Sequence, residues 1–455
     1  MHQLSTGEPV WDLEYSEDGA LVSPTAGDEL LSGIRDRGLR DLFVVSHGWN
    51  NSPQVAQSLY DDLFPLVREA SSARGTIGPL GFAGVFWPSL WFPPTPATPP
   101  PSGGGLQSSG TVSTPLSSGT QEVSGAEIAR ALSQGFSDPD QRAALADVGR
   151  LIDEGQAAVG TGLTEAARLD HVQQIHQRMA LLVPPSPPTP EAGDDGERAL
   201  LYADDPRAAY LATARAFGTV PPGSATQGVG DWFGGALNGA KDALRVLSYT
   251  LMKARAGTIG RTALGPLLVR VHRQAPELRV HLVGHSFGAR LVSFALAGIP
   301  DAGDSPVASL VLLQGAFSHF SFSPMAPFGQ PGALAGCSDR VSGPLAATFT
   351  EYDWAVGIWY RRASFLARQD QSGEASAGRW GGMGADGFQA VEPLVDLTMR
   401  GDGSDDYKLE PGTFHRVDAT AVINDVQGQP FSGAHSDIRK APVADLIAQA
   451  AEPRS

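Results

Sequence analysis

The chain has 455 residues, of which 42% are hydrophobic, and a formal net charge of −16 at pH 7. This length allows a sizeable core in one large domain or two smaller ones. The negative charge argues against binding to nucleic acid or to anionic membranes. The single cysteine, Cys337, excludes an internal disulfide and a cysteine-rich metal site.

The amino-terminal residues lack the basic start and apolar segment of a secretory signal peptide. No stretch has the length and apolar character of a transmembrane helix. We therefore expect a cytoplasmic protein without a transmembrane segment; export by a route that needs no such signal is the alternative.

Strand and helix patterns alternate at the start of the chain. The expected elements are a hairpin (10–16 and 20–22), a helix (28–37), buried strands at 42–45 and 80–87, and between them a helix capped by Ser52 and started by Pro53. We assign residues 1–91 to the first part of an α/β core.

The middle of the chain has a different composition. Residues 92–125 are rich in Pro, Ser and Gly, which predicts a flexible linker. Residues 126–256 have mainly helical spacing and are interpreted as a helical insertion, either a cap over the core or an accessory bundle at its side. The segment 231–237 is apolar enough to line an acyl pocket or to anchor the insertion in the core.

Alternation returns over residues 257–455, the second part of the core. The expected elements are strands at 278–283, 307–313, 345–350 and 414–423 and helices at 258–274, 289–296 and 442–451. The pattern predicts an α/β fold with a mostly parallel sheet flanked by helices and a large helical insertion between two core strands.

The pentapeptide Gly284-His285-Ser286-Phe287-Gly288 lies between a predicted strand and a predicted helix. A G-x-S-x-G sequence in that context is typical of the nucleophile elbow of serine hydrolases. Gly284 and Gly288 are expected because the turn is too tight for side chains on either side of the serine. The turn presents the Ser286 hydroxyl at the edge of the sheet.

Three further pieces also follow predicted strands. They are the turn at 47–49, Asp353 and His435. Because ligand chemistry in open parallel sheets gathers at the carboxyl ends of the strands, we expect these pieces to meet Ser286 at one edge.

With these residues the chain resembles the α/β-hydrolase superfamily of serine esterases and lipases, in which the triad follows the order Ser, Asp, His. The sequences H-G-W-N-N at 47–51 and W-P-S at 87–89 are similar to those of a poorly characterised bacterial branch. The resemblance implies that Ser286 is the nucleophile, that His435 is its base and that Asp353 orients the imidazole.

The resemblance also implies an oxyanion hole formed by the backbone N–H groups of Trp49 and Phe287. The residues expected to shape the site are His47, Gly48, Gly284, His285 and Gly288.

Other residues compete for two of these roles. His415 also follows Asp353, but it lies inside the predicted strand 414–423. Glu351, Asp418 and Asp425 compete with Asp353 for the role of the acid. A G-x-G-x-x-G sequence at 382–387 follows no predicted strand, so we interpret it as a flexible loop and not as a dinucleotide site.

The resemblance implies a hydrolase that cleaves a small or lipid-like ester through an acyl-enzyme, without a cofactor or metal. An acyltransferase or thioesterase with the same triad is one alternative. Another is a non-catalytic binding protein of the same fold, with a partner protein bound through the insertion.

Overall fold

A computed structural model describes residues 1–49, 51–75, 78–89, 123–133, 135–182, 203–216, 231–327, 329–360, 381–402, 406–427 and 432–453. The predicted linker at 92–125 lies almost entirely outside these residues.

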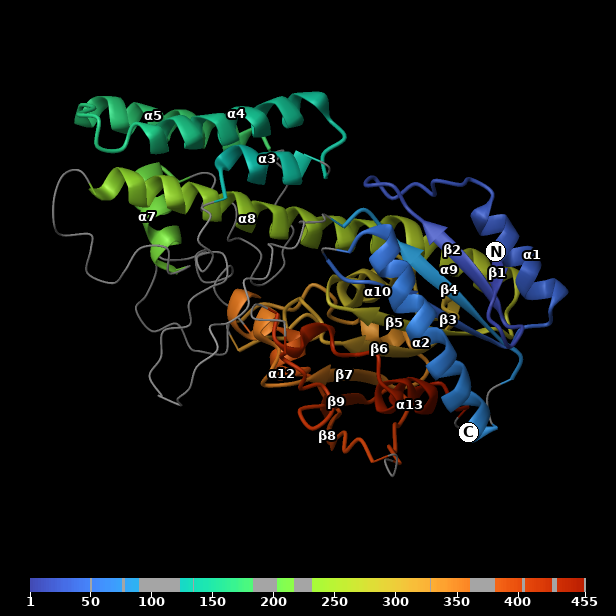
Figure 1. The fold of residues 1–455 in the computed structure, drawn as a ribbon. Coiled ribbons are helices and arrows are strands. Elements are labelled where there is room, and N and C mark those ends of the chain that lie inside the picture. The colour runs from blue at the N-terminus through green and yellow to red at the C-terminus, as the bar shows by residue number, and fades with distance from the viewer. Residues whose placement is uncertain are drawn as a thin grey trace.

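A sheet of nine strands forms the centre of the molecule, in the order β1-β2-β4-β3-β5-β6-β7-β9-β8 (Figure 1). All neighbouring pairs are parallel except β1 and β2. The strands are β1 (His2–Gln3), β2 (Pro9–Glu14), β3 (Asp41–Ser46), β4 (Leu80–Phe86), β5 (Arg279–His285), β6 (Val307–Leu313), β7 (Leu345–Phe349), β8 (Leu394–Thr398) and β9 (Phe414–Asp418). The predicted α/β class with a mostly parallel sheet is confirmed.

Helices cover both faces of this sheet. One face packs against α2 (Pro53–Arg74) and α13 (Ala441–Ala450). The opposite face packs against α1 (Ala26–Asp36), α8 (Asp231–Ile259), α9 (Gly265–Gln274) and α10 (Phe287–Ala297) (Figure 1). Each face has its own apolar core.

Alternation along β3 shows how the sequence builds these two cores. Leu42 and Val44 belong to the core on the α10 side, and Phe43 and Val45 belong to the core on the α2 side. All four are at most 3% exposed. A strand that is buried on both faces has a continuous run of apolar residues, and for this reason β3 could be predicted from the sequence.

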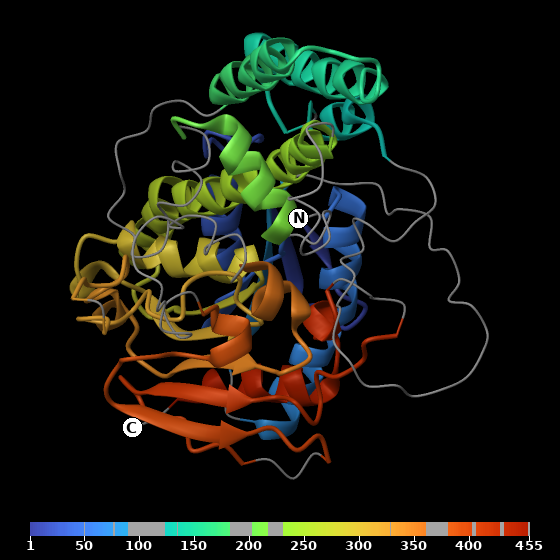
Figure 2. The same cartoon turned by 90° about the vertical axis from the view of Figure 1, so that its left-hand side faces the viewer.

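The helices described between β4 and the end of α8 lie in the predicted insertion. Besides α8 they are α3 (Gly125–Ser133), α4 (Pro139–Ala157), α5 (Glu165–Ala180) and α7 (Pro206–Ala216). They pack against one another and against α8. In Figure 2 the teal and green α3, α4 and α5 lie at the end of the molecule opposite to the orange-red β8 and β9.

The start of α8 packs inside this insertion. Trp232 and Phe233 are buried, and the Arg207 guanidinium lies 4.1 Å above the Trp232 ring. The Phe233 ring contacts His171 of α5 at 5.7 Å between centroids. These contacts hold the start of α8 against α5 and α7 within the insertion.

Four expectations about single elements are wrong. The hairpin is reduced to one bridge between Tyr15 and Leu21. The insertion expected to end at 256 and the helix predicted at 258–274 are joined in one continuous helical segment through a π-helical turn, Gly260–Leu264. The strand expected at 414–423 ends at Asp418, and the loop expected at 382–387 contains the short helix α12 (Met383–Asp386).

Strand β8 has no counterpart among the predicted elements. Among the described strands it pairs with β9 alone, at the edge of the sheet. Its residues are exposed or half-buried, so it lacks the apolar run that reveals a central strand.

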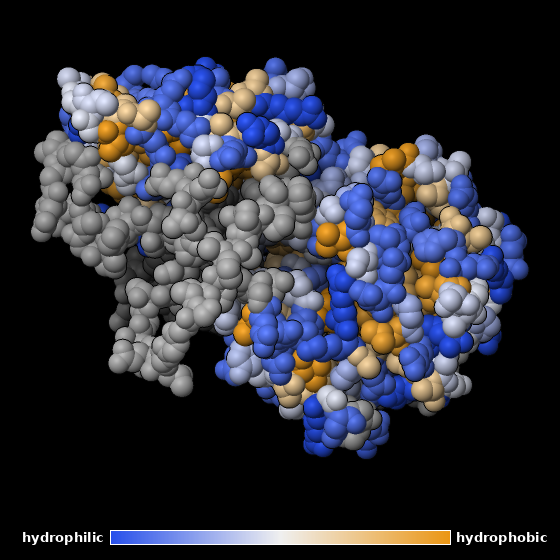
Figure 3. All heavy atoms as spheres, in the orientation of Figure 1, coloured by the Kyte–Doolittle hydropathy of each residue, from blue (hydrophilic) through white to orange (hydrophobic). Residues whose placement is uncertain are grey.

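The face shown in Figure 3 mixes hydrophilic and hydrophobic residues, and in its described part the hydrophobic ones form small separate areas. None of the helices that the structure describes has the length and hydropathy needed to cross a membrane.

Candidate active site

Ser286 lies in the turn between β5 and α10, with φ 57° and ψ −121°. A positive φ is strained for a residue with a side chain, so the surrounding structure must hold it. The Ser286 N–H donates to the Leu313 carbonyl at 3.1 Å, and the Ser286 carbonyl accepts from the Ala316 N–H at 3.1 Å. The G-x-S-x-G sequence therefore adopts the strand–turn–helix context that this motif requires.

Both glycines of the pentapeptide are held against backbone. A Cβ atom at Gly284 would lie 2.4 Å from the Ala289 Cα, and one at Gly288 would lie 2.2 Å from the Ser46 carbonyl oxygen. The turn is thus too tight for side chains at either position, as the sequence predicted.

Asp353 and His435 come together from two different strands. Asp353 follows β7, and His435 lies in a short 3₁₀ helix, Ala434–Ser436, after β9. His435 Nδ1 lies 2.8 Å from Asp353 Oδ2, and the two residues are 8% and 1% exposed. The Val356 N–H donates to Asp353 Oδ1 at 2.9 Å. The Asp353 carboxylate can only accept this hydrogen bond, so the neutral imidazole carries its hydrogen on Nδ1. The Nε2 atom then has a free lone pair.

His435 lies beside the Ser286 turn. Its ring centroid is 5.0 Å from that of His285, and His285 Nε2 donates to the His435 carbonyl at 2.8 Å. Among the described residues, no hydrogen bond joins the Ser286 hydroxyl to His435. The structure thus joins the predicted base to the predicted acid and places His435 beside the turn that carries Ser286. Catalytic hydrogen bonds are often long before a substrate binds.

His285 is suited to a structural role. Burial and the nearby His435 lower the pKa of His285 to about 3, so its ring is neutral at physiological pH. A neutral ring with its proton at Nε2 can hold the His435 backbone while remaining uncharged next to the site.

The turn at 47–49 packs directly against Ser286. A Cβ atom at Gly48 would lie 2.6 Å from the Ser286 Cβ, so a larger residue would push against the serine. His47 fixes this turn to the end of β4, because the Trp87 N–H donates to its Nε2 at 3.3 Å and the Trp87 indole donates to its carbonyl at 3.0 Å. Burial lowers the pKa of His47 to about 4, which keeps the ring neutral.

Trp49 and Phe287 carry the predicted oxyanion donors. As the first residue of α10, Phe287 has no carbonyl within the helix for its N–H. The two side chains meet at 6.2 Å between ring centroids, and Tyr249 of α8 contacts both, at 5.8 Å from Trp49 and 4.9 Å from Phe287. The insertion therefore contributes an aromatic ring beside the candidate site.

The competing residues lie in other surroundings. His415 is completely buried within β9, where its Nε2 accepts from the Glu410 N–H at 3.2 Å. Glu351 is exposed on the surface. Neither residue is hydrogen-bonded to the Asp353–His435 pair. His415 is therefore a packed strand residue, and Glu351 is a surface residue.

Gln314 was missed by the sequence analysis. It follows β6 directly and is fully buried, and its Nε2 donates to Asp353 Oδ2 at 3.0 Å. A polar residue directly after the apolar run 307–313 was the available signal.

A second Ser–His–Asp set lies in the amino-terminal halves of the central strands β3, β5 and β6. His281 Nδ1 is 2.9 Å from Ser309 Oγ, and its Nε2 is 3.0 Å from Asp41 Oδ1. Burial favours a raised pKa of Asp41, but His281 and the Arg279 guanidinium outweigh it and lower that pKa. Ser309, His281 and Asp41 are at most 1% exposed, so this set links β3, β5 and β6 and offers no access to a substrate.

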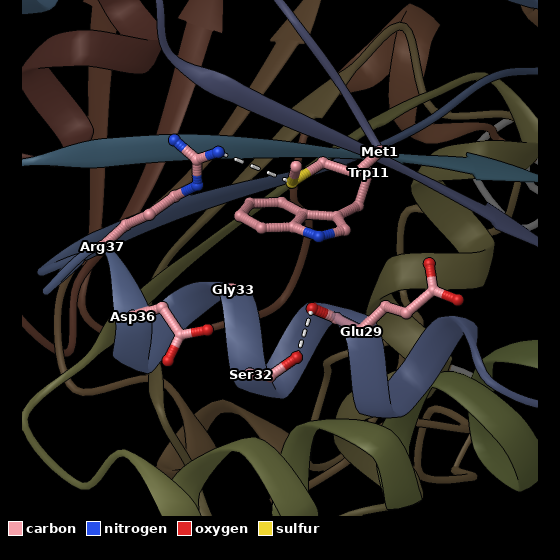
Figure 4. A pocket seen from close by; sticks show the side chains of 7 residues that line it. All are labelled: Met1, Trp11, Glu29, Ser32, Gly33, Asp36 and Arg37. Atoms are coloured by element: carbon pink, nitrogen blue, oxygen red, sulfur yellow. Dashed lines mark hydrogen bonds between the residues drawn. The ribbon is translucent and has the colours of Figure 1, made fainter.

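A surface pocket of about 450 Å³ lies over the β2 side of the sheet, between α1 and Trp11 (Figure 4). It is lined by Met1, Trp11, Glu29, Ser32, Gly33, Asp36 and Arg37. Figure 4 shows Trp11 lying flat along α1, where a Cβ atom at Gly33 would come 2.4 Å from the indole. The pocket contains none of the predicted site residues.

Within the described residues, no group of three or more His, Cys, Asp or Glu side chains could hold a metal ion. No protein-family model matches the chain, and no curated protein or solved structure matches it significantly.

Proposed function

We propose that this protein is a serine hydrolase of the α/β-hydrolase type that cleaves an ester through an acyl-enzyme. The strained turn at Ser286, together with the 2.8 Å contact between His435 and Asp353, is the observation that supports the proposal most strongly. The Ser, Asp, His order along the chain agrees with it.

In the first half-reaction, Ser286 Oγ attacks the ester carbonyl while His435 Nε2 takes its proton. Asp353 accepts from Nδ1 and stabilises the imidazolium that forms. The negative oxygen of the tetrahedral intermediate binds the N–H groups of Phe287 and Trp49. Collapse of the intermediate breaks the bond to the alcohol, which leaves with the proton from His435.

In the second half-reaction, His435 takes a proton from water, and the resulting hydroxide attacks the acyl carbon. Collapse releases the acid and returns the proton to Ser286. All transferred groups come from the substrate, from water or from these side chains, so the proposed reaction needs no cofactor. If another alcohol or thiol replaced water, the same steps would make an acyltransferase.

Replacing Ser286 with alanine tests this proposal. For hydrolysis of 4-nitrophenyl butyrate we expect kcat to fall by roughly three to six orders of magnitude, since the nucleophile is lost. Ser293→Ala is the matched control, because Ser293 is a fully buried serine of α10 outside the site. A Ser286→Ala variant with the activity of the control would refute the assignment and would favour a binding protein.

A further inference from the structure

We propose that Gln314 is a positioning residue that holds the Asp353 carboxylate toward His435. This inference rests on the proposed function and adds a member to the proposed triad, acting through Asp353 without contacting the substrate.

The side chain of Gln314 has a defined orientation. The Gln314 backbone N–H donates to Thr348 Oγ1 at 3.1 Å, and the Thr348 hydroxyl donates to Gln314 Oε1 at 2.8 Å. Both residues are fully buried. Because Oε1 receives the hydroxyl hydrogen, the amide nitrogen must point the other way, toward Asp353.

The amide nitrogen uses both of its hydrogens. One is donated to Asp353 Oδ2 and the other to the Gly384 carbonyl, each at 3.0 Å. Asp353 Oδ2 thus lies between Gln314 and His435, and its Oδ1 accepts from the Val356 N–H. The carboxylate cannot rotate away from His435 without breaking buried hydrogen bonds, which are expensive to leave unmade.

The backbone of Gln314 is also strained into place, with φ 48°. For a residue with a side chain, such a conformation persists only where the surroundings impose it. It occurs directly after β6, next to Leu313, whose carbonyl holds the Ser286 N–H. One short segment therefore supports both the serine and the acid.

Gly384 completes this arrangement. A Cβ atom there would lie 2.8 Å from Asp353 Oδ2 and 2.7 Å from the Gln314 carbonyl carbon. The Gly384 carbonyl also accepts from the Thr350 N–H at 3.1 Å. The G-x-G-x-x-G sequence at 382–387 thus packs its backbone directly against the Asp353 carboxylate and the Gln314 backbone.

The first test is Gln314→Leu, which removes both hydrogen-bond donors at similar length. We expect kcat for 4-nitrophenyl butyrate to fall about 100-fold with KM nearly unchanged, because a misplaced acid affects the transition state and not ground-state binding. The acid limb of the pH profile of kcat/KM should also move.

Gln449→Leu is the matched control. Gln449 is likewise a buried glutamine that donates to a carboxylate, Asp445 Oδ2 at 2.8 Å, but it lies on α13. Both variants should lose thermal stability, and Gln314→Leu alone should lose kcat. Equal kcat in the two variants would overturn the inference.

A second variant, Gly384→Ala, covers the case in which Gln314→Leu does not fold. It keeps the amide but pushes a methyl group against Asp353, so kcat should again fall with KM nearly unchanged. Native kcat in this variant would contradict the inference.

A readout without turnover separates this inference from the proposed function. The proton between His435 Nδ1 and Asp353 should give a low-field NMR resonance in the native protein, which Gln314→Leu should shift or broaden. If the native protein neither hydrolyses the ester nor reacts with a fluorophosphonate, the proposed function fails. The inference about Gln314 then stands if the resonance changes and falls if it does not.

Discussion

In the proposed mechanism, Asp353 determines which nitrogen of His435 acts as the base. Its Oδ2 accepts from Nδ1, which leaves the Nε2 lone pair available to the serine. An amide at position 353 would offer an N–H group instead and would favour the opposite tautomer.

Asp353→Asn should therefore lower kcat for 4-nitrophenyl butyrate by about 10⁴-fold while the fold is kept, as loss of the correct tautomer does in serine proteases. Glu351→Gln is the control, because it changes an exposed carboxyl two residues earlier and should have native kcat. If Glu351→Gln lost activity and Asp353→Asn did not, the acid would have been assigned to the wrong residue.

At the residue scale, the sequence alone predicts those site residues that belong to a motif or follow a predicted strand in a fixed order. Ser286 has a motif, and Asp353 and His435 follow predicted strands at the expected positions. Gln314 and Tyr249 belong to no motif. Their contacts arise from side chains that approach through tertiary packing, which spacing along the chain does not encode.

At the element scale, tertiary packing also explains why the sequence did not predict the continuous helix formed by α8, the π-helical turn and α9. The predicted insertion ended at 256 and the next predicted helix began at 258; Gly257 lies between them, and Gly260 and Gly265 follow. In the structure they face α10: a Cβ atom at Gly260 would lie 2.2 Å from the Leu291 carbonyl oxygen. These glycines allow two helix backbones to approach closely, and they do not end the helix.

Gly260→Ala should therefore destabilise the protein by about 1–3 kcal/mol, because the added methyl group overpacks the contact with α10. Gly234→Ala is the matched control on α8, where the nearest atom lies 3.8 Å from the new Cβ. It should be neutral or stabilising by up to about 1 kcal/mol, since alanine favours helix. Urea unfolding measures both; equal effects would contradict this account of the helix contact.

At the scale of the whole molecule, buried neutral histidines link folding to pH. His47 and His285 have pKa values lowered to about 4 and about 3, whereas a histidine in the unfolded chain titrates near 6.5. Between these values the unfolded chain binds protons that the folded chain does not. The free energy of unfolding must therefore decrease as the pH falls from about 6.5 toward 4.

Each of the two histidines should contribute a slope of about 1.4 kcal/mol per pH unit in this window. Urea unfolding followed by tryptophan fluorescence at several pH values measures the slope. His47→Gln should reduce it, and His2→Gln, which removes an exposed histidine, should leave it unchanged. A stability that is constant or rises on acidification would rule out buried neutral histidines.

The α/β class with its mostly parallel sheet was the most predictable feature of the chain. Buried strands such as β3 and β6 are continuous apolar runs, and their alternation with helices indicates a parallel sheet. The exposed edge strand β8 lacks such a run, and the path of the insertion depends on helix contacts that no local pattern reveals.

The most direct test of the central claim is to treat the native protein with a fluorophosphonate and to locate the adduct by mass spectrometry. We expect a single adduct on Ser286, none in Ser286→Ala, and native labelling in Ser293→Ala. Such a probe reacts with serines activated by a base, so labelling at Ser286 would identify an active triad. A native protein that does not react, or that reacts equally after Ser286→Ala, would contradict the proposed function.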